Sequence, residues 1–201
     1  MLTWSDDLST LFLGLDSGLI CRYLVDKKKG CMAMKELGDI NVHNNQMRVM
    51  GIAVDARVNH MFSISESGYL IVTNLADPLT EKGKFMSSQN LSSSGLKAMI
   101  HDSVRNILVI ASGAGEVFIL NVLPSEPQTI IKLETDQRVC IRGLTRSISL
   151  NDDWVVPGQK LVKKGGLNQN LLLASDVNGY ITIFDINSPG KEYLAKRVGN
   201  V

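Results

Sequence analysis

Aromatic residues and cysteines are scarce in this sequence, and long apolar runs are missing. Phe, Trp and Tyr make up 5% of the 201 residues, and there are 3 cysteines. So few cysteines argue against a disulfide-built secreted domain. No stretch approaches the roughly 18 apolar residues that a transmembrane helix needs, and the acidic first residues lack the pattern of a signal peptide. Basic and acidic residues number 21 and 20, which argues against a nucleic-acid-binding chain. We therefore expect a globular, cytoplasmic protein.

Glycine, in contrast, is abundant at 17 residues, and it marks an internal repeat. Four segments share an apolar run, a short turn that ends in glycine, and an alternating run. This pattern predicts a β-hairpin. The four segments are LFLGLDSGLICRYLV from Leu11, MFSISESGYLIVTNL from Met61, ILVIASGAGEVFILNV from Ile107 and LLLASDVNGYITIFDI from Leu172.

The hairpins stay in register when their turn glycines are aligned. These glycines are Gly18, Gly68, Gly115 and Gly179, and we expect each to adopt a positive φ, which glycine takes at little cost. The residues two and four positions later share one face of a strand. They are Ile20, Leu70, Val117 and Ile181, then Arg22, Val72, Ile119 and Ile183. Arg22 is the one polar member, and we expect it to mark an exposed edge.

Further apolar runs before and after each hairpin complete a unit of four short strands. Repeated four-stranded units of about 40–50 residues predict an all-β, WD40-like β-propeller. We place its blades at about 1–47, 48–95, 96–138 and 139–201 in one domain. Because WD-repeat rings commonly have seven blades, these four are either a whole propeller or part of a larger ring.

Several segments resemble WD-repeat proteins. Gly179–Asp185 is similar to the closing strand of a WD repeat, with Phe184 at the tryptophan position, and His43 sits where such repeats often carry a histidine. Leu13–Ile20, together with Ser93–Leu96 leading on to Gly115–Leu120, resembles the WD-repeat proteins that carry a FYVE zinc finger and associate with endosomes.

That resemblance implies a propeller that holds partners and makes endosomal association an alternative location. A FYVE finger needs paired CxxC ligands, and no two of Cys21, Cys31 and Cys140 lie closer than ten residues. The phosphoinositide-binding module is therefore not expected within these 201 residues.

No catalytic or metal-binding pattern stands out. His43, His60 and His101 have no carboxylate or cysteine at ligand or triad spacing, and no phosphate-binding glycine loop opens a helix. We expect a protein that is not an enzyme and uses neither metal nor cofactor.

The last unit is longer than the others because of an insertion near 149–170. It contains Trp154 and Val155 beside Lys160, Lys163 and Lys164, and an apolar anchor with a polar rim is typical of a partner contact. Two alternatives remain open: Trp154 packs into its own blade, or the segment forms an extra hairpin around Pro157–Gly158.

The sequence thus favours a non-catalytic WD-repeat scaffold that binds other proteins through its faces and loops, within a larger complex. The alternative is an endosome- or phosphoinositide-associated adaptor whose lipid-binding module lies elsewhere. Its membrane contact through this chain would be peripheral at most.

Overall fold

The computed structural model describes residues 1–5, 8–26, 33–43, 47–75, 84–103, 105–122, 127–135, 138–146, 171–185 and 192–197. Within them, sixteen strands form four separate four-stranded antiparallel sheets. The described residues contain no helix that is long and apolar enough to span a membrane. The predicted all-β class, with four blades of four strands each, is confirmed.

Each sheet uses consecutive strands, and we number the blades 1 to 4 along the chain. Blade 1 consists of β1 (Leu2–Ser5), β2 (Thr10–Gly14), β3 (Leu19–Asp26) and β4 (Ala33–Asn41). Blade 2 consists of β5 (Val49–Asp55), β6 (His60–Ser65), β7 (Tyr69–Asn74) and β8 (Lys84–Asn90). Blade 3 consists of β9 (Leu96–Asp102), β10 (Ile107–Ser112), β11 (Glu116–Asn121) and β12 (Gln128–Glu134). Blade 4 consists of β13 (Ile141–Arg146), β14 (Leu171–Asp176), β15 (Tyr180–Asp185) and β16 (Glu192–Arg197).

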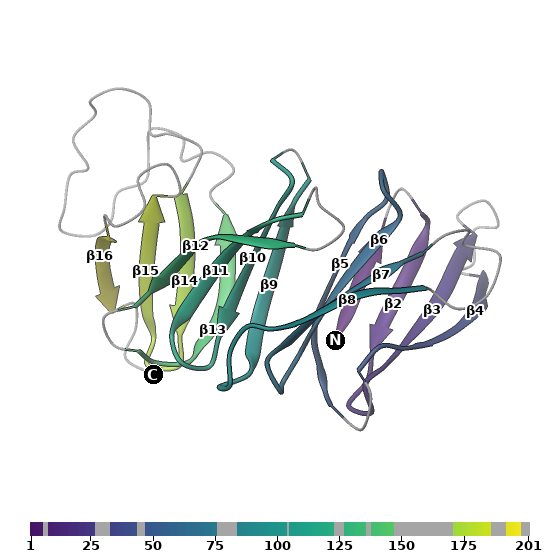
Figure 1. Ribbon diagram of the computed structural model, residues 1–201, viewed down its shortest axis with the longest axis horizontal. Helices are drawn as coiled ribbons and strands as arrows, with labels where there is room; N and C mark the ends of the chain where they lie inside the picture. Colours follow the sequence, from purple (N-terminus) through teal and green to yellow (C-terminus); the bar gives the residue numbers. More distant parts are fainter. Residues whose placement is uncertain are drawn as a thin grey trace.

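The blades stand side by side in chain order, from the purple blade 1 to the yellow-green blade 4 (Figure 1). The main contacts between described strands of different blades join consecutive blades, through β5 packed on β1 and β2, β9 on β5 and β6, and β13 on β9 and β10. Three apolar clusters fill the spaces between blades 1 and 2, 2 and 3, and 3 and 4. The row is therefore stabilised by burial between sheets, which contributes roughly 25 cal/mol for each Å² of apolar surface removed from water.

The turn glycines have the expected backbone. The φ values of Gly18, Gly68, Gly115 and Gly179 are 83, 95, 78 and 79°. A Cβ atom on Gly68 would run into the carbonyl oxygen of Ser92, in the loop that leads to blade 3. The turns at Gly18, Gly68 and Gly115 therefore need glycine both for its conformation and for a close contact with the loop that leads to the next blade.

A second repeated turn precedes the second strand of three blades. Ser9, Asn59 and Asn106 adopt positive φ values of 47, 55 and 55°. The carbonyl oxygen of each accepts a hydrogen bond from a backbone N–H of its own blade, donated by Val25, Leu75 and Val122 respectively. Asparagine tolerates this left-handed conformation better than most residues do, and the aligned hairpin pattern in the sequence does not mark these positions.

Candidate functional site

Each blade has two faces, and the strand register shows which neighbour each one meets. We call the face toward the next blade along the chain the forward face, and the face toward the previous blade the backward face. The forward face carries the residues two and four positions after the turn glycine, such as Leu70 and Val72 in blade 2. The backward face carries the residues three and five positions after it, such as Phe118 and Leu120 in blade 3.

At the junction of blades 2 and 3 both faces are fully packed. On the backward face of blade 3, Leu108 pairs with Leu120 and Ile110 pairs with Phe118 across β10 and β11. These four side chains are 0 to 5% exposed. They pack in one cluster with Phe62, Ile64, Leu70 and Val72 from the forward face of blade 2.

The backward face of blade 1 has the same design but no described blade against it. Leu11 pairs with Tyr23, and Leu13 pairs with Cys21. Leu2 and Trp4 of β1 continue the face beside them, and they are 61% and 38% exposed. Burial, together with a hydrogen bond involving Asp39, raises the pKa of Cys21 to about 11. The thiol is therefore uncharged at neutral pH, and these six residues form an apolar surface. Two exposed carboxylates of β4 lie beside it on the same face, since Asp39 is the strand partner of Cys21 and Glu36 that of Tyr23.

The forward face of blade 4, at the other end of the row, is apolar on its two middle strands, while the β13 partner of Leu173 is the exposed Thr145. Leu173 pairs with Ile183 across β14 and β15, and Ile181 lies further along β15 on the same side. All three are partly exposed, whereas their counterparts in blade 3, Val109 and Ile119, are 2% exposed.

A polar cluster joins blades 2 and 3 at one end of their strands, where one turn connects β5 to β6 and another connects β9 to β10. The Asp55 carboxylate accepts hydrogen bonds from the backbone N–H of Arg57 and from its side chain, at 2.6 to 3.1 Å. Arg57 also donates to the side-chain oxygen of Asn106 in blade 3, at 2.8 Å. The hydrogen bonds from Arg57 hold the pKa of Asp55 below its usual value. The Arg57 guanidinium, held in place by the Asp55 carboxylate, therefore connects the two blades.

The sequence places no carboxylate at ligand or triad spacing from His101, but the fold brings Asp55 beside it. Its Nε2 atom lies 3.6 Å from Oδ2 of Asp55. Burial lowers the pKa of His101, although Asp55 opposes the shift. Sequence spacing could not reveal this pair, because the two residues come from different blades. At 3.6 Å the two atoms are too far apart for a good hydrogen bond, so the pair adds to the packing between blades.

A second polar cluster lies at the opposite end of that junction, around Glu116. Its Oε2 atom accepts hydrogen bonds from Ser92 at 2.6 Å and Ser112 at 2.8 Å, and its Oε1 atom lies 2.8 Å from Nζ of Lys132. Burial raises the pKa of Glu116, but the hydrogen bonds from these three partners outweigh it and hold the pKa below its usual value. The hydroxyl of Ser112 also accepts two backbone N–H groups of its own turn. The cluster thus fixes the turn at Gly115 and joins it to the loop of Ser92.

His43 has a structural role at the junction of blades 1 and 2. It is 1% exposed, and its Nε2 atom lies 3.1 Å from Oγ of Ser63 in β6. Burial lowers its pKa to about 4. The histidine is therefore neutral at physiological pH and joins the loop after blade 1 to the second strand of blade 2.

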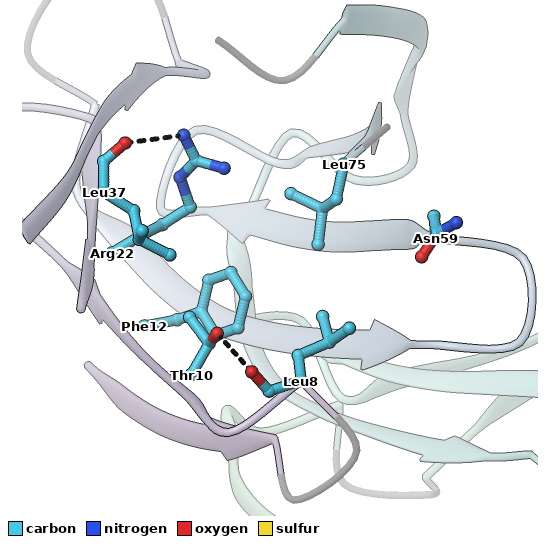
Figure 2. Close-up of a pocket in the computed structure, with 7 residues that line it drawn as sticks. All are labelled: Leu8, Thr10, Phe12, Arg22, Leu37, Asn59 and Leu75. Carbon is cyan, nitrogen blue, oxygen red and sulfur yellow. Dashed lines mark hydrogen bonds between the residues drawn. The ribbon is translucent and has the colours of Figure 1, made fainter. Parts of the chain in front are cut away.

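Arg22 is buried, contrary to the expectation of an exposed edge. Its side chain is 3% exposed, and its guanidinium donates to the backbone oxygens of Gly38 and Leu37, at 3.4 and 3.2 Å. Burial lowers its pKa. It lines a cavity of about 10 Å³ between blades 1 and 2, with Phe12 and Leu75 among its neighbours (Figure 2). That space suits a single water molecule, so the cavity is too small for an organic substrate.

The partner-contact residues proposed from the sequence, Trp154, Val155, Lys160, Lys163 and Lys164, lie outside the described residues, and their role stays a prediction. Among the residues that the structure describes, no group of three or more His, Cys, Asp or Glu side chains could hold a metal ion.

Comparison with known proteins supports the fold and gives no closer relationship. No family model and no curated protein matches the chain. Among solved structures, a chain of the mitotic checkpoint complex, a WD40 propeller, aligns with 98% of this chain and 50% of its own length, with 18% identity and a TM-score of 0.69. The computationally designed protein Ika8 aligns with 98% of this chain and 48% of its own length, with 17% identity and a TM-score of 0.66.

The chain therefore has a propeller-like fold and spans about half the length of these solved chains. At such low identity the likeness carries the fold alone. No comparison bears on the FYVE-related resemblance, which stays a prediction.

Proposed function

We propose that this protein is a non-catalytic scaffold that binds other proteins, and that the backward face of blade 1 is its main contact surface. The exposed apolar face carries this proposal. Leu2 and Trp4 are exposed on it, and Tyr23 adds a second large aromatic side chain. Trp and Tyr are enriched among the residues that dominate binding energy at protein interfaces.

The framework behind this face supports the same function. Hydrogen bonds and ion pairs hold the turns at both ends of the junction between blades 2 and 3, and apolar clusters fill all three junctions. A surface held by such a framework loses little conformational entropy on binding, which favours affinity. One solved chain with a similar fold comes from a multi-protein assembly, the mitotic checkpoint complex, which is consistent with this use of the fold.

The test is an affinity capture with the intact chain, comparing the wild type with a Leu2→Asp/Tyr23→Asp double variant. We expect the wild type to retain specific protein partners. The amount retained by the double variant should fall at least about tenfold, since a buried unpaired charge costs more than 1.4 kcal/mol of binding free energy. The control is Val58→Asp/Phe85→Asp. These residues of blade 2 are 48% and 60% exposed and lie away from the face, so the control variant should bind normally.

Circular dichroism must show the same strand content for the two variants. Equal retention of partners by the wild type and the Leu2→Asp/Tyr23→Asp variant would contradict the proposed surface. A wild type that retains no protein would contradict the scaffold function itself.

A further inference from the structure

We propose that two copies of this chain associate head to tail, so that the forward face of blade 4 in each copy packs on the backward face of blade 1 in the other. The two chains, each an arc of four blades, then close into one ring of eight blades. This inference rests on the proposed function, because it uses the same face of blade 1 and names its partner.

The first argument is the register of the two end faces. Leu11, Leu13 and Tyr23 occupy the positions that Leu108, Ile110 and Leu120 occupy in blade 3, relative to the turn glycine and the paired strand. The residues of blade 3 are completely buried against blade 2. The backward face of blade 1 is thus built to be covered by a forward face.

The second argument is that blade 4 offers such a forward face. Leu173, Ile181 and Ile183 take the positions of Val109, Val117 and Ile119 in blade 3. In blade 3 these side chains belong to the cluster that packs on blade 4. The middle strands of the two end faces therefore match those of the two sides of an internal junction.

The third argument is the span of the arc. The four blades form an open row with blade 1 and blade 4 at its ends (Figure 1), and the chain aligns with 48 to 50% of the two solved chains. Two arcs together give eight blades, which is within the usual range of about four to eight for a propeller. A head-to-tail contact that closes after a two-fold rotation gives a finite ring instead of an open filament.

A face-to-face dimer of two blade 1 surfaces is the main structural alternative for a second copy. It would join two backward faces and leave blade 4 uncovered. The internal junctions all join a forward face to a backward face, and for this reason we favour the head-to-tail arrangement.

The experiment measures the mass of the full 201-residue chain by light scattering after gel filtration, at several concentrations. We expect twice the single-chain mass of 22.0 kDa. Leu2→Asp on blade 1 and Ile183→Asp on blade 4 should each shift the protein to the single-chain mass. Val58→Asp, in the turn between β5 and β6, is the matched control and should stay at twice that mass.

Mixing the two variants sharpens the test. The Leu2→Asp copy keeps an intact blade 4 face and the Ile183→Asp copy keeps an intact blade 1 face, so the mixture can form one unmodified junction and should recover the double mass. This recovery also shows that each variant is folded. Because Leu2 is already 61% exposed in the single chain, its substitution is not expected to unfold blade 1.

Several outcomes would overturn the proposal. A wild type of single-chain mass at all concentrations contradicts self-association, and a ladder of higher masses contradicts ring closure. An Ile183→Asp variant that stays at the double mass indicates the face-to-face dimer. If the wild type has the single-chain mass but the Leu2→Asp/Tyr23→Asp variant still loses its captured partners, this inference fails and the proposed scaffold function stands.

Discussion

The junction between blades 2 and 3 and the backward face of blade 1 use the same strand positions, but they differ in what covers them. Leu108 is 0% exposed beneath blade 2, whereas its counterpart Leu11 is only partly buried. Polar groups at both ends further stabilise the internal junction, through Arg57 and Asn106 at one end and Glu116 and Ser92 at the other. The comparison indicates that the hydrophobic pattern of a blade encodes its capacity to pack, while the neighbouring surface determines how much free energy that packing contributes.

The largest expected effect comes from truncating the same residue type in both places. Leu108→Ala should lower the free energy of unfolding by about 2–5 kcal/mol, because it leaves a cavity in a fully packed core. Leu11→Ala should cost less than about 1 kcal/mol in a dilute, single-chain sample, since less apolar surface is lost from burial. Urea unfolding of both variants at low and high protein concentration checks this.

The same two variants also test whether a second copy of the chain covers the backward face of blade 1. If two copies cover the face, the cost of Leu11→Ala should rise with protein concentration while that of Leu108→Ala stays constant. Equal costs for the two substitutions in the dilute sample would contradict the view that the two faces differ in burial.

A second comparison uses two glycines with positive φ. Gly68 contacts the loop toward blade 3, and its φ is 95°; Gly38 in blade 1 has a φ of 90° and nothing within 4 Å of an added Cβ. Gly38→Ala should cost about 1 kcal/mol for the left-handed backbone alone. Gly68→Ala should cost about 3 kcal/mol, because displacing Ser92 adds an overpacking cost of about 1–3 kcal/mol. Thermal unfolding measures both, and a cost for Gly38→Ala equal to that for Gly68→Ala would show that the contact with the Ser92 loop is unimportant.

The sequence was sufficient to predict the fold class because the turn glycines and the alternating strands are local features. Gly18, Gly68, Gly115 and Gly179 keep the same backbone for the same steric reason, and this allowed the repeats to be aligned without a structure. Packing across a junction is not local. For this reason the burial of Arg22 and the approach of His101 to Asp55 were missed, since each depends on the residues that a neighbouring strand or blade brings close.

For the functional surface the limit is different. The residues of the backward face of blade 1, such as Leu11 and Tyr23, look like ordinary core residues in the sequence, because their pattern is that of a buried strand. Only the arrangement of the blades reveals that this face is partly exposed. The insertion with Trp154 was easier to notice in the sequence, but its role stays a prediction.

Acid should weaken the internal junction between blades 1 and 2, because His43 is buried there without a charge. Burial lowers the pKa of His43 from 6.5 to about 4, so as the pH falls below 6.5 the unfolded chain takes up a proton that the native junction excludes. This linkage lowers the free energy of unfolding, by about 2 kcal/mol at pH 5. Burial lowers the pKa of His60 and His101 in the same direction.

Urea unfolding of the wild type and of His43→Gln between pH 7.5 and pH 5 tests this effect. The variant should lose less stability over that range, by about 2 kcal/mol, because glutamine does not titrate. An identical pH dependence for the variant and the wild type would show that His43 takes up a proton as easily in the folded chain as in the unfolded one.

The smallest expected effect is at the rim of the junction between blades 2 and 3. Nζ of Lys97 lies 3.3 Å from Oε1 of Glu66, whose side chain is 53% exposed. Because water and salt screen exposed ion pairs, Glu66→Gln should change the free energy of unfolding by less than about 0.5 kcal/mol. Unfolding at low and at high salt measures this, and a cost above 1 kcal/mol that disappears in salt would contradict the prediction. In that case the charged rim, together with the apolar core, would account for the stability that separates this junction from the end face.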